Sequence, residues 1–340
     1  MKTPINQLLR FAFAALLAAV WAVSAPAAER IKLATLAPTG STYQKSLLAL
    51  KDAWRKASNG GVDLVVYADG KLGGEADVVG LMGVNSVQAA MLTAVGLTEI
   101  EKAVSGLQYI PMGFHDFAEV DYVGEKMQPM LDEWLAQKGF VVLFWIDAGW
   151  VRFFTKKPVT HPDDLKKLKL FTWSGNPQQV EIYKWAGFDA VALETADVLP
   201  SLQTGLIDAA PLPPVFALAT QVDTRAPHMI EINWAPMIGA CVVRKATWEK
   251  IPAATREALL KIAVETGKEI KRNGRLEMDA SVQAMEKRGL KVTKVTPEIE
   301  NEWRTAAEAV YPKIRGKLVP EDVFDATLRL LKEYRTGQGH

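Results

Sequence analysis

The chain has 340 residues, of which 49% are hydrophobic, and its 40 Lys and Arg residues balance 39 Asp and Glu residues. This balance excludes the strongly basic field that partners such as nucleic acid or an anionic membrane require. The one cysteine, Cys241, cannot form an internal disulfide, so a hydrophobic core, most simply divided between two lobes, must stabilise the fold.

The N-terminal segment predicts export. Lys2 and Arg10 provide positive charge, residues 11–23 are apolar, and Ala25-Pro26-Ala27 offers a small-x-small cleavage site. The thirteen-residue apolar run is too short to span a bilayer core of about 30 Å. A buried core helix is the alternative, but the run has no amphipathic face. We therefore expect residues 1–28 to be a cleaved signal peptide, with the mature protein in the periplasm and not inserted in the membrane.

Strand-like and helix-like segments alternate along the next part of the chain. Strands are predicted over residues 31–36, 62–67 and 87–92, and helices over residues 42–58 and 75–82. Such alternation predicts an α/β fold with a largely parallel sheet.

Two apolar runs, residues 139–146 and 235–243, lie on either side of a long intervening segment. The simplest topology has two lobes between which the chain crosses more than once, with a ligand cleft at the crossing. We expect lobe I to contain residues 29–148 and about 237–275. Lobe II should contain residues 149–236 and about 276–340.

A helix-like stretch from residue 252 to 289 is interrupted only by Gly267 and Gly274. One continuous helix would be about 54 Å long and would reach across both lobes. Two helices that meet at Gly274 are the alternative. Thr296 and Pro297 predict the start of another helix, and the last helix is expected over residues 321–334.

Catalytic motifs are missing from the sequence. It contains no H-E-x-x-H, G-x-S-x-G, P-loop or G-x-G-x-x-G pattern, and its four histidines are scattered. Asp163 and Asp164 follow Pro162, where acidic side chains favour the positive end of a helix dipole. Cys241 lies in an apolar, strand-like run and is interpreted as a structural thiol. We therefore expect no catalytic residues, no metal and no cofactor.

Three motifs carry a resemblance to a known family. They are YADGKLGGE at residues 67–75, the set Lys157-Pro158, Pro162-Asp163-Asp164-Leu165 and Lys169, and LQTGLID at residues 202–208. Together they resemble the solute-binding proteins of TRAP (tripartite ATP-independent periplasmic) transporters, over nearly the whole mature chain. The resemblance implies two α/β lobes joined by hinge strands, a long helix spanning both lobes, and a ligand enclosed between them. It also implies delivery of that ligand to membrane permease subunits.

The resemblance transfers the ligand site only in part. Phe171 occupies the position at which the family has an arginine that clamps a substrate carboxylate, and Leu212 occupies the position of a family asparagine. Arg152 falls on a second, less uniform family arginine. Tyr43 ends the Thr39–Tyr43 segment, which matches the loop that closes over ligand.

The loss of the clamp arginine leaves two alternatives open. A carboxylate buried against Phe171 would cost several kcal/mol, so either it shifts to Arg152 or the ligand carries no carboxylate there. Aromatic residues are enriched in segments expected to face the cleft, and we interpret Trp145 and Phe153 as core and Phe171 and Trp173 as pocket residues. The predicted ligand contacts are Tyr43, Arg152, Phe171, Trp173, Leu212, Phe216 and Trp234. Glu194 is a further candidate, either for a ligand amine or hydroxyl or as a partner of Arg152.

The predicted function is that of a TRAP solute-binding protein that captures a small organic solute. An aromatic or otherwise apolar organic acid is the ligand hypothesis. A receptor that passes its ligand to a sensor kinase and an exported enzyme are the alternatives.

Overall fold

The computed structural model describes residues 28–337, so the predicted signal segment lies outside the described residues except for Ala28. The described residues form one mixed sheet with the strand order β2-β1-β3-β8-β4-β7-β5-β6, and β9 pairs with β8. The strands are β1 (Glu29–Thr35), β2 (Val62–Tyr67), β3 (Ala89–Thr93), β4 (Phe140–Thr155), β5 (Lys169–Trp173), β6 (Asp189–Leu193), β7 (Ala209–Leu212), β8 (His228–Arg244) and β9 (Lys291–Thr293).

Two parallel groups of strands are joined by an antiparallel pair. β1 runs parallel to β2 and β3, and β5 runs parallel to β6 and β7. β4 and β8 are antiparallel to each other, and they pair antiparallel with β7 and β3 respectively. The prediction of a largely parallel sheet therefore holds within each group but is wrong for the centre. There, two long strands cross between the lobes in opposite directions, which requires an antiparallel pair.

The β4–β8 ladder is interrupted where the chain crosses between the lobes. Its register shifts between Asp147 and Trp150, and Gly149 between them has a φ of +89° that favours glycine. Trp150 pairs with Pro236, which has no N–H to donate to the ladder. The register shift lies next to the lobe boundaries expected at 148/149 and 236/237, which stay a prediction. Fewer backbone hydrogen bonds hold the strands together here, which suits a hinge.

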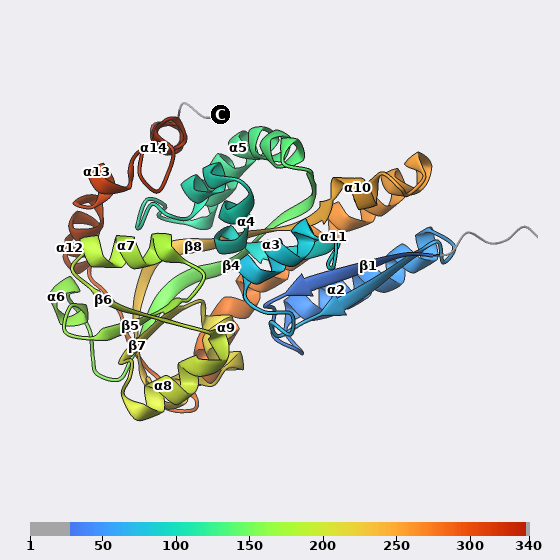
Figure 1. Cartoon of the computed structure of the whole chain (residues 1–340). Coiled ribbons are helices and arrows are strands. Elements are labelled where there is room, and N and C mark those ends of the chain that lie inside the picture. Colours follow the sequence, from blue (N-terminus) through green and yellow to red (C-terminus); the bar gives the residue numbers. More distant parts are fainter. Residues whose placement is uncertain (1–27, 338–340) are drawn as a thin grey trace, which may run out of the picture.

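Helices cover both faces of the sheet (Figure 1). They are α2 (Thr42–Ala57), α3 (Glu75–Gly83), α4 (Ala94–Ile100), η1 (Lys102–Leu107), α5 (Phe117–Gln137), α6 (Pro162–Leu165), α7 (Pro177–Trp185), η2 (Thr195–Asp197), α8 (Val198–Thr204), α9 (Pro214–Ala219), η3 (Val222–Thr224), α10 (Lys245–Trp248), α11 (Ala253–Glu286), α12 (Pro297–Glu308), α13 (Tyr311–Ile314) and α14 (Glu321–Arg335). The predicted start of α12 is confirmed, because the Thr296 hydroxyl accepts a hydrogen bond from the N–H of Ile299. No element was predicted for α4, η1 and α5.

The long helix α11 is continuous over 34 residues. It packs against α2 in the first lobe, against β4, and against α9 in the second lobe, so the predicted helix spanning both lobes is confirmed. Its two glycines mark close approaches rather than interruptions. A Cβ on Gly267 would lie 2.5 Å from Phe144 Cβ, and one on Gly274 would lie 2.4 Å from the Tyr43 hydroxyl. Larger residues at these positions would push the helix away from β4 and α2.

The C-terminal helices cross from one lobe back to the other. α12 packs against α6 in the second lobe, where the fully buried Trp303 donates its Nε1–H to the carbonyl of Thr160 at 2.8 Å. α14 packs against α5 and η1, beside the first lobe (Figure 1). The expectation that residues of about 276–340 belong to lobe II therefore does not match α14, which contacts helices of lobe I.

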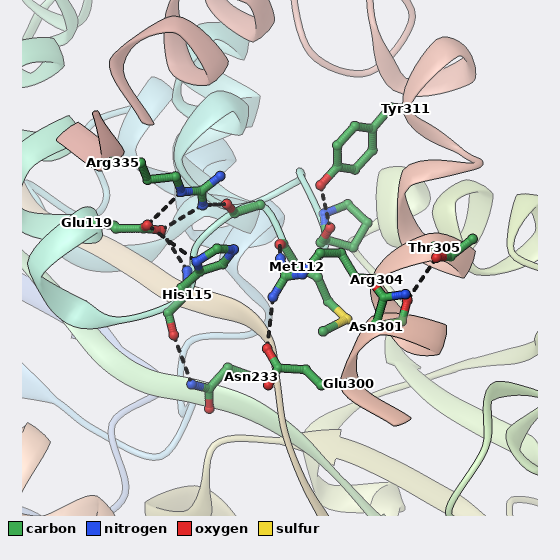
Figure 2. A network of polar contacts seen from close by, with 12 residues as sticks. Met112, His115, Glu119, Asn233, Glu300, Asn301, Arg304, Thr305, Tyr311 and Arg335 are labelled. Atoms are coloured by element: carbon green, nitrogen blue, oxygen red, sulfur yellow. Dashed lines mark hydrogen bonds and ion pairs between the residues drawn. The ribbon is translucent and has the colours of Figure 1, made fainter. Parts of the chain in front are cut away.

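The loop between η1 and α5 receives hydrogen bonds from this C-terminal segment and from β8 (Figure 2). Tyr311, Arg304, Arg335 and Asn233 donate to the backbone carbonyls of Pro111, Met112, Gly113 and His115 respectively. Arg335 also contacts both oxygens of Glu119 at 2.7 and 2.9 Å. Side chains that are distant in sequence thus fix this loop, because its own backbone has few local partners.

Candidate ligand-binding cleft

A cavity of about 750 Å³ lies between the two lobes. The first lobe contributes Leu36, Pro38, Asp69, Gly70, Gly73, Gly74, Glu75, Ala76, Asp77, Thr93 and Val95. The second lobe contributes Trp173, Ser174, Gly175, Glu194, Thr195, Ala196, Phe216 and Thr220, and Met237 of β8 completes the lining. We call this cavity the cleft.

The position of the cleft follows from the sheet topology. Its lining segments come directly after β1, β2, β3, β5 and β6, and Phe216 lies just beyond β7. Both parallel groups therefore direct the carboxyl ends of their strands toward the gap between the lobes. Ligands of open α/β sheets bind at such ends.

The apolar part of the lining is centred on Trp173 and Phe216. Trp173 ends β5, and its Nε1–H donates to the Thr195 hydroxyl at 3.1 Å, which fixes the indole. Phe216 lies on α9 and retains 9% exposure. An indole and a phenyl ring provide a surface on which a ring or an aliphatic chain of a solute can be buried.

Charge in the cleft is acidic. The lining holds the carboxylates Asp69, Glu75, Asp77 and Glu194, and none of the lining residues is Lys, Arg or His. Lys71 pairs with Asp69 at 3.7 Å, but it is not among the lining residues. Thr39 donates to both Asp69 oxygens, and these hydrogen bonds are the main reason that the pKa of Asp69 lies below its ordinary value.

Glu75 and Asp77 cap helices with their carboxylates. Glu75 accepts from the N–H and the hydroxyl of Thr93, both at 2.7 Å, and from the N–H of Gly96 at 2.8 Å, at the N-terminus of α4. Burial raises the pKa of Glu75, and these three hydrogen bonds oppose the rise. Asp77 accepts from the N–H of Gly74 at 3.2 Å, at the N-terminus of α3.

Glu194 lies at the rim, where the lobes approach each other. One of its oxygens accepts from the Ser174 hydroxyl, and the other would lie 3.6 Å from a Cβ built on Gly74 in the opposite lobe. A second cross-lobe contact joins the Tyr109 hydroxyl to Asn176 Oδ1 at 3.2 Å. The lobes therefore meet along one edge of the cleft, as expected for a closed arrangement.

Two of the seven predicted ligand contacts, Trp173 and Phe216, lie on the lining. Phe171 does not: its side chain is fully buried and packs edge-on against Trp173, with ring centroids 4.9 Å apart. The alternation of β5 places both rings on one face of the strand. Trp173 lies nearer the strand end, so the ring at position 171 supports the wall of the cleft from behind.

Arg152 and Leu212 are also enclosed. Arg152 is 6% exposed, and its Nη1 lies 3.6 Å from Glu231 Oε1, so its partner is Glu231 rather than Glu194. Burial lowers the pKa of Arg152, while the carboxylates of Glu231 and Asp279 oppose this change. The Nε of Arg152 is buried without a hydrogen-bond partner among residues 28–337. Leu212 packs with Phe171 in a separate apolar cluster of the second lobe.

Tyr43 and Trp234 belong to the packed interior. The Tyr43 hydroxyl donates to the backbone carbonyl of Asp147 at 3.2 Å, which ties α2 to the hinge segment of β4. Trp234 contacts Phe153 and Trp303, with ring centroids 5.4 and 6.5 Å apart. Most of the aromatic enrichment noted in the sequence therefore fills the core, because broad rings are needed between the sheet and α7 and α12.

The largest group of lining residues that sequence reasoning missed lies in the segment 69–77 and at Thr93. The sequence carried a signal for them, since they directly follow predicted strands of a parallel group. The motif at 67–75 contributed to the family resemblance, but it was not placed in the site.

Other features of the chain do not form a second site in the described region. Residues 28–337 contain no group of three or more His, Cys, Asp and Glu side chains placed to hold a metal ion. None of the helices described is long and apolar enough to cross a membrane. Cys241 is fully buried in β8, as predicted, and this burial raises the pKa of its thiol.

Two lobes, a hinge in the crossing strands and a cleft at their strand ends define a solute-binding protein of the periplasmic type. The chain belongs to the bacterial extracellular solute-binding protein, family 7, whose pattern matches residues 33–317. This is the family of the TRAP solute-binding proteins, so the resemblance seen in the sequence is confirmed. The family consists of solute receptors rather than enzymes.

Relatives and solved structures of this kind cover almost the whole chain. The C4-dicarboxylate-binding periplasmic protein DctP of Rhodobacter capsulatus is 24% identical over 313 residues, which are 89% of this chain and 92% of DctP. A TRAP periplasmic solute-binding protein from Ralstonia eutropha H16 with bound (S)-2-acetolactate has a TM-score of 0.83 at 20% identity, covering 90% of this chain and 99% of that one. One from Sulfurospirillum deleyianum with bound succinate has a TM-score of 0.81 at 20% identity, covering 89% and 99%.

Proposed function

We propose that the chain is the periplasmic solute receptor of a TRAP transporter, without catalytic activity. It captures a small organic solute between its lobes and delivers the solute to the membrane permease subunits. The observation that carries the proposal is the cleft of about 750 Å³, which both lobes line in a member of this family. The export signal predicted over residues 1–28 supports the periplasmic location.

Closure of the hinge is the proposed mechanism. A solute that contacts both lobes stabilises the closed state by its differential affinity for that state. The interrupted ladder at 147–150 supplies the bending point, and the Tyr109–Asn176 contact supplies a cross-lobe bond that opening would break. The closed form then presents a surface made of both lobes to the permease.

The solute is proposed to have a substantial apolar or aromatic part. Trp173 and Phe216 are the contacts that support this proposal, because they form the apolar wall of the cleft. The relatives described above bind organic acids. This chain differs from the family pattern at the clamp position, where Phe171 is buried behind Trp173.

Small-angle scattering on ligand-free and ligand-loaded protein tests the proposed function. The mature chain is unfolded, dialysed and refolded to remove any solute that copurifies, and that solute is identified by mass spectrometry. We expect the stripped protein to have a larger radius of gyration, and return of the solute to reduce it and raise the melting temperature. A protein that retains no small molecule and never closes, or that converts the molecule chemically, would contradict the proposal. Uptake of the solute by cells with and without the permease genes separates transport from signalling through a sensor kinase.

A further inference from the structure

The cleft offers an anionic group no cationic partner. A buried carboxylate needs a cation or several free N–H donors, and it is strongly disfavoured next to like charge. The lining holds four carboxylates and neither Lys, Arg nor His. The distribution of charge therefore opposes the binding of organic acids.

Helix N-termini could supply N–H donors instead, but at α3, α4 and α7 a side chain of the protein already accepts at least one of these N–H groups. Glu75 accepts the N–H groups of Thr93 and Gly96 at the start of α4. Asp77 accepts the N–H of Gly74 at the start of α3, and Asn176 accepts the N–H of Gln179 at the start of α7. At these three helices a side chain of the protein therefore competes with a ligand carboxylate for the position that gains from the helix dipole.

Arg152 does not reverse this balance. It is buried next to Glu231 and Asp279, whose carboxylates offset its charge, and it is absent from the lining. A solute carboxylate would have to leave the cleft and displace an existing ion pair to reach it.

We propose that the cleft selects solutes without a negative charge, namely molecules with an apolar body and a hydroxyl or amine that donates hydrogen bonds. This inference rests on the proposed function of the cleft. The apolar body lies against Trp173 and Phe216. The donating group faces Glu194, which is exposed and whose carboxylate accepts only from the Ser174 hydroxyl among the hydrogen bonds found for it. A carboxylate at the rim next to an aromatic wall is also a favourable combination for an ammonium group.

Three ligands that share one phenyl ring test the inference: 2-phenylethylamine, 2-phenylethanol and 3-phenylpropanoate. Their affinities for ligand-stripped protein are measured by calorimetry at pH 7 in low salt. We expect the amine or the alcohol to bind at least tenfold more tightly than the acid, and amine binding without alcohol binding identifies an ammonium site. Tightest binding of the acid would overturn the inference.

Two variants test whether the Glu194 carboxylate recognises the amine. Glu194→Gln is expected to weaken amine binding five- to tenfold and to leave alcohol binding within twofold. Asp197→Asn makes the same charge change three positions further on, outside the lining, and is expected to leave both affinities unchanged. Equal losses in the two variants would overturn the role of Glu194.

The outcome is decisive even if no phenyl compound binds. The charge of the solute that copurifies then decides: a neutral or cationic molecule supports the inference, and an anion overturns it. Absence of any bound small molecule would contradict the proposed function itself, which is a different result.

Discussion

Replacement of Arg275 by methionine is expected to lower the free energy of unfolding by about 3–5 kcal/mol, because it leaves a buried carboxylate unpaired. Arg275 lies on α11 and donates to both oxygens of Asp147 in the hinge segment of β4, with Nε at 3.2–3.4 Å and Nη2 at 2.8 Å. Asp147 is 1% exposed, so water cannot replace these bonds. Urea denaturation at pH 7 measures the change.

The second partner of Arg275 is less affected by this substitution. Asp121 on α5 accepts from Nη1 and Nη2 of Arg275 at 2.8 and 2.6 Å, but it also pairs with Lys271. The predicted loss therefore comes mainly from Asp147. Because Arg275 joins α11 and α5 to the crossing strand, it ties the hinge to the helix that spans both lobes.

The loss of unfolding free energy caused by Arg275→Met should increase with pH. Burial already raises the pKa of Asp147, and loss of the arginine removes the main opposing interaction. A carboxyl whose folded-state pKa lies above its unfolded-state value binds more protons when folded, so stability falls as pH rises toward the folded-state pKa. The deficit of the variant relative to the parent should therefore be smaller at pH 5 than at pH 7.

Two controls accompany this experiment. Asp147→Asn combined with Arg275→Met should recover most of the stability, because the buried charge is removed together with its partner. Arg272→Met, at an exposed position of the same helix, should change stability by less than about 0.5 kcal/mol. A loss below about 1 kcal/mol for Arg275→Met would show that the buried pair does not stabilise the hinge.

Replacement of Trp173 by alanine is expected to weaken binding of the captured solute 10- to 100-fold, or by about 1.4–2.8 kcal/mol. The indole lines the cleft, donates a hydrogen bond to the Thr195 hydroxyl and packs against the ring of Phe171. Because its orientation is already fixed, the side chain loses little conformational entropy when a solute binds. Calorimetry on ligand-stripped protein with the copurifying solute measures the effect.

Trp185→Ala is the matched control for Trp173→Ala. Both tryptophans are partly buried in the second lobe, but Trp185 ends α7, packs near Lys317 and lies outside the lining. We expect the Trp185→Ala variant to bind the solute with an affinity within twofold of the parent. The Trp173→Phe variant should retain most of the parent's affinity. Unchanged binding by Trp173→Ala would remove the indole from the site.

Local patterns in the sequence were sufficient for the elements whose signals are local. The β-branched run at 62–67, the apolar spacing of residues 42–58 and the cap at Thr296 each depend on neighbours a few positions away. The central antiparallel pair was not predicted, because nothing in a strand's own sequence states which way its partner runs. Gly267 and Gly274 resembled breaks in a helix, whereas the structure uses them to bring α11 close to β4 and α2.

The candidate site was predicted less completely, for a related physical reason. Phe171 and Trp173 are two residues apart on one face of β5, and only tertiary packing decides which ring is covered. Val198 and Leu202 of α8 join the apolar cluster that encloses Phe171, and α8 is far from β5 in sequence. The carboxylates of the cleft follow two strands, β2 and β6, that lie in different lobes, so their accumulation becomes visible only when the sheet is assembled.

A crystal structure of the protein with its copurifying solute tests the central claim most directly. We predict that the solute lies between Trp173 and the segment 73–77, enclosed by both lobes, with a donating group next to Glu194. A solute found outside the cleft, or one that places a carboxylate on the guanidinium of Arg152, would contradict this account.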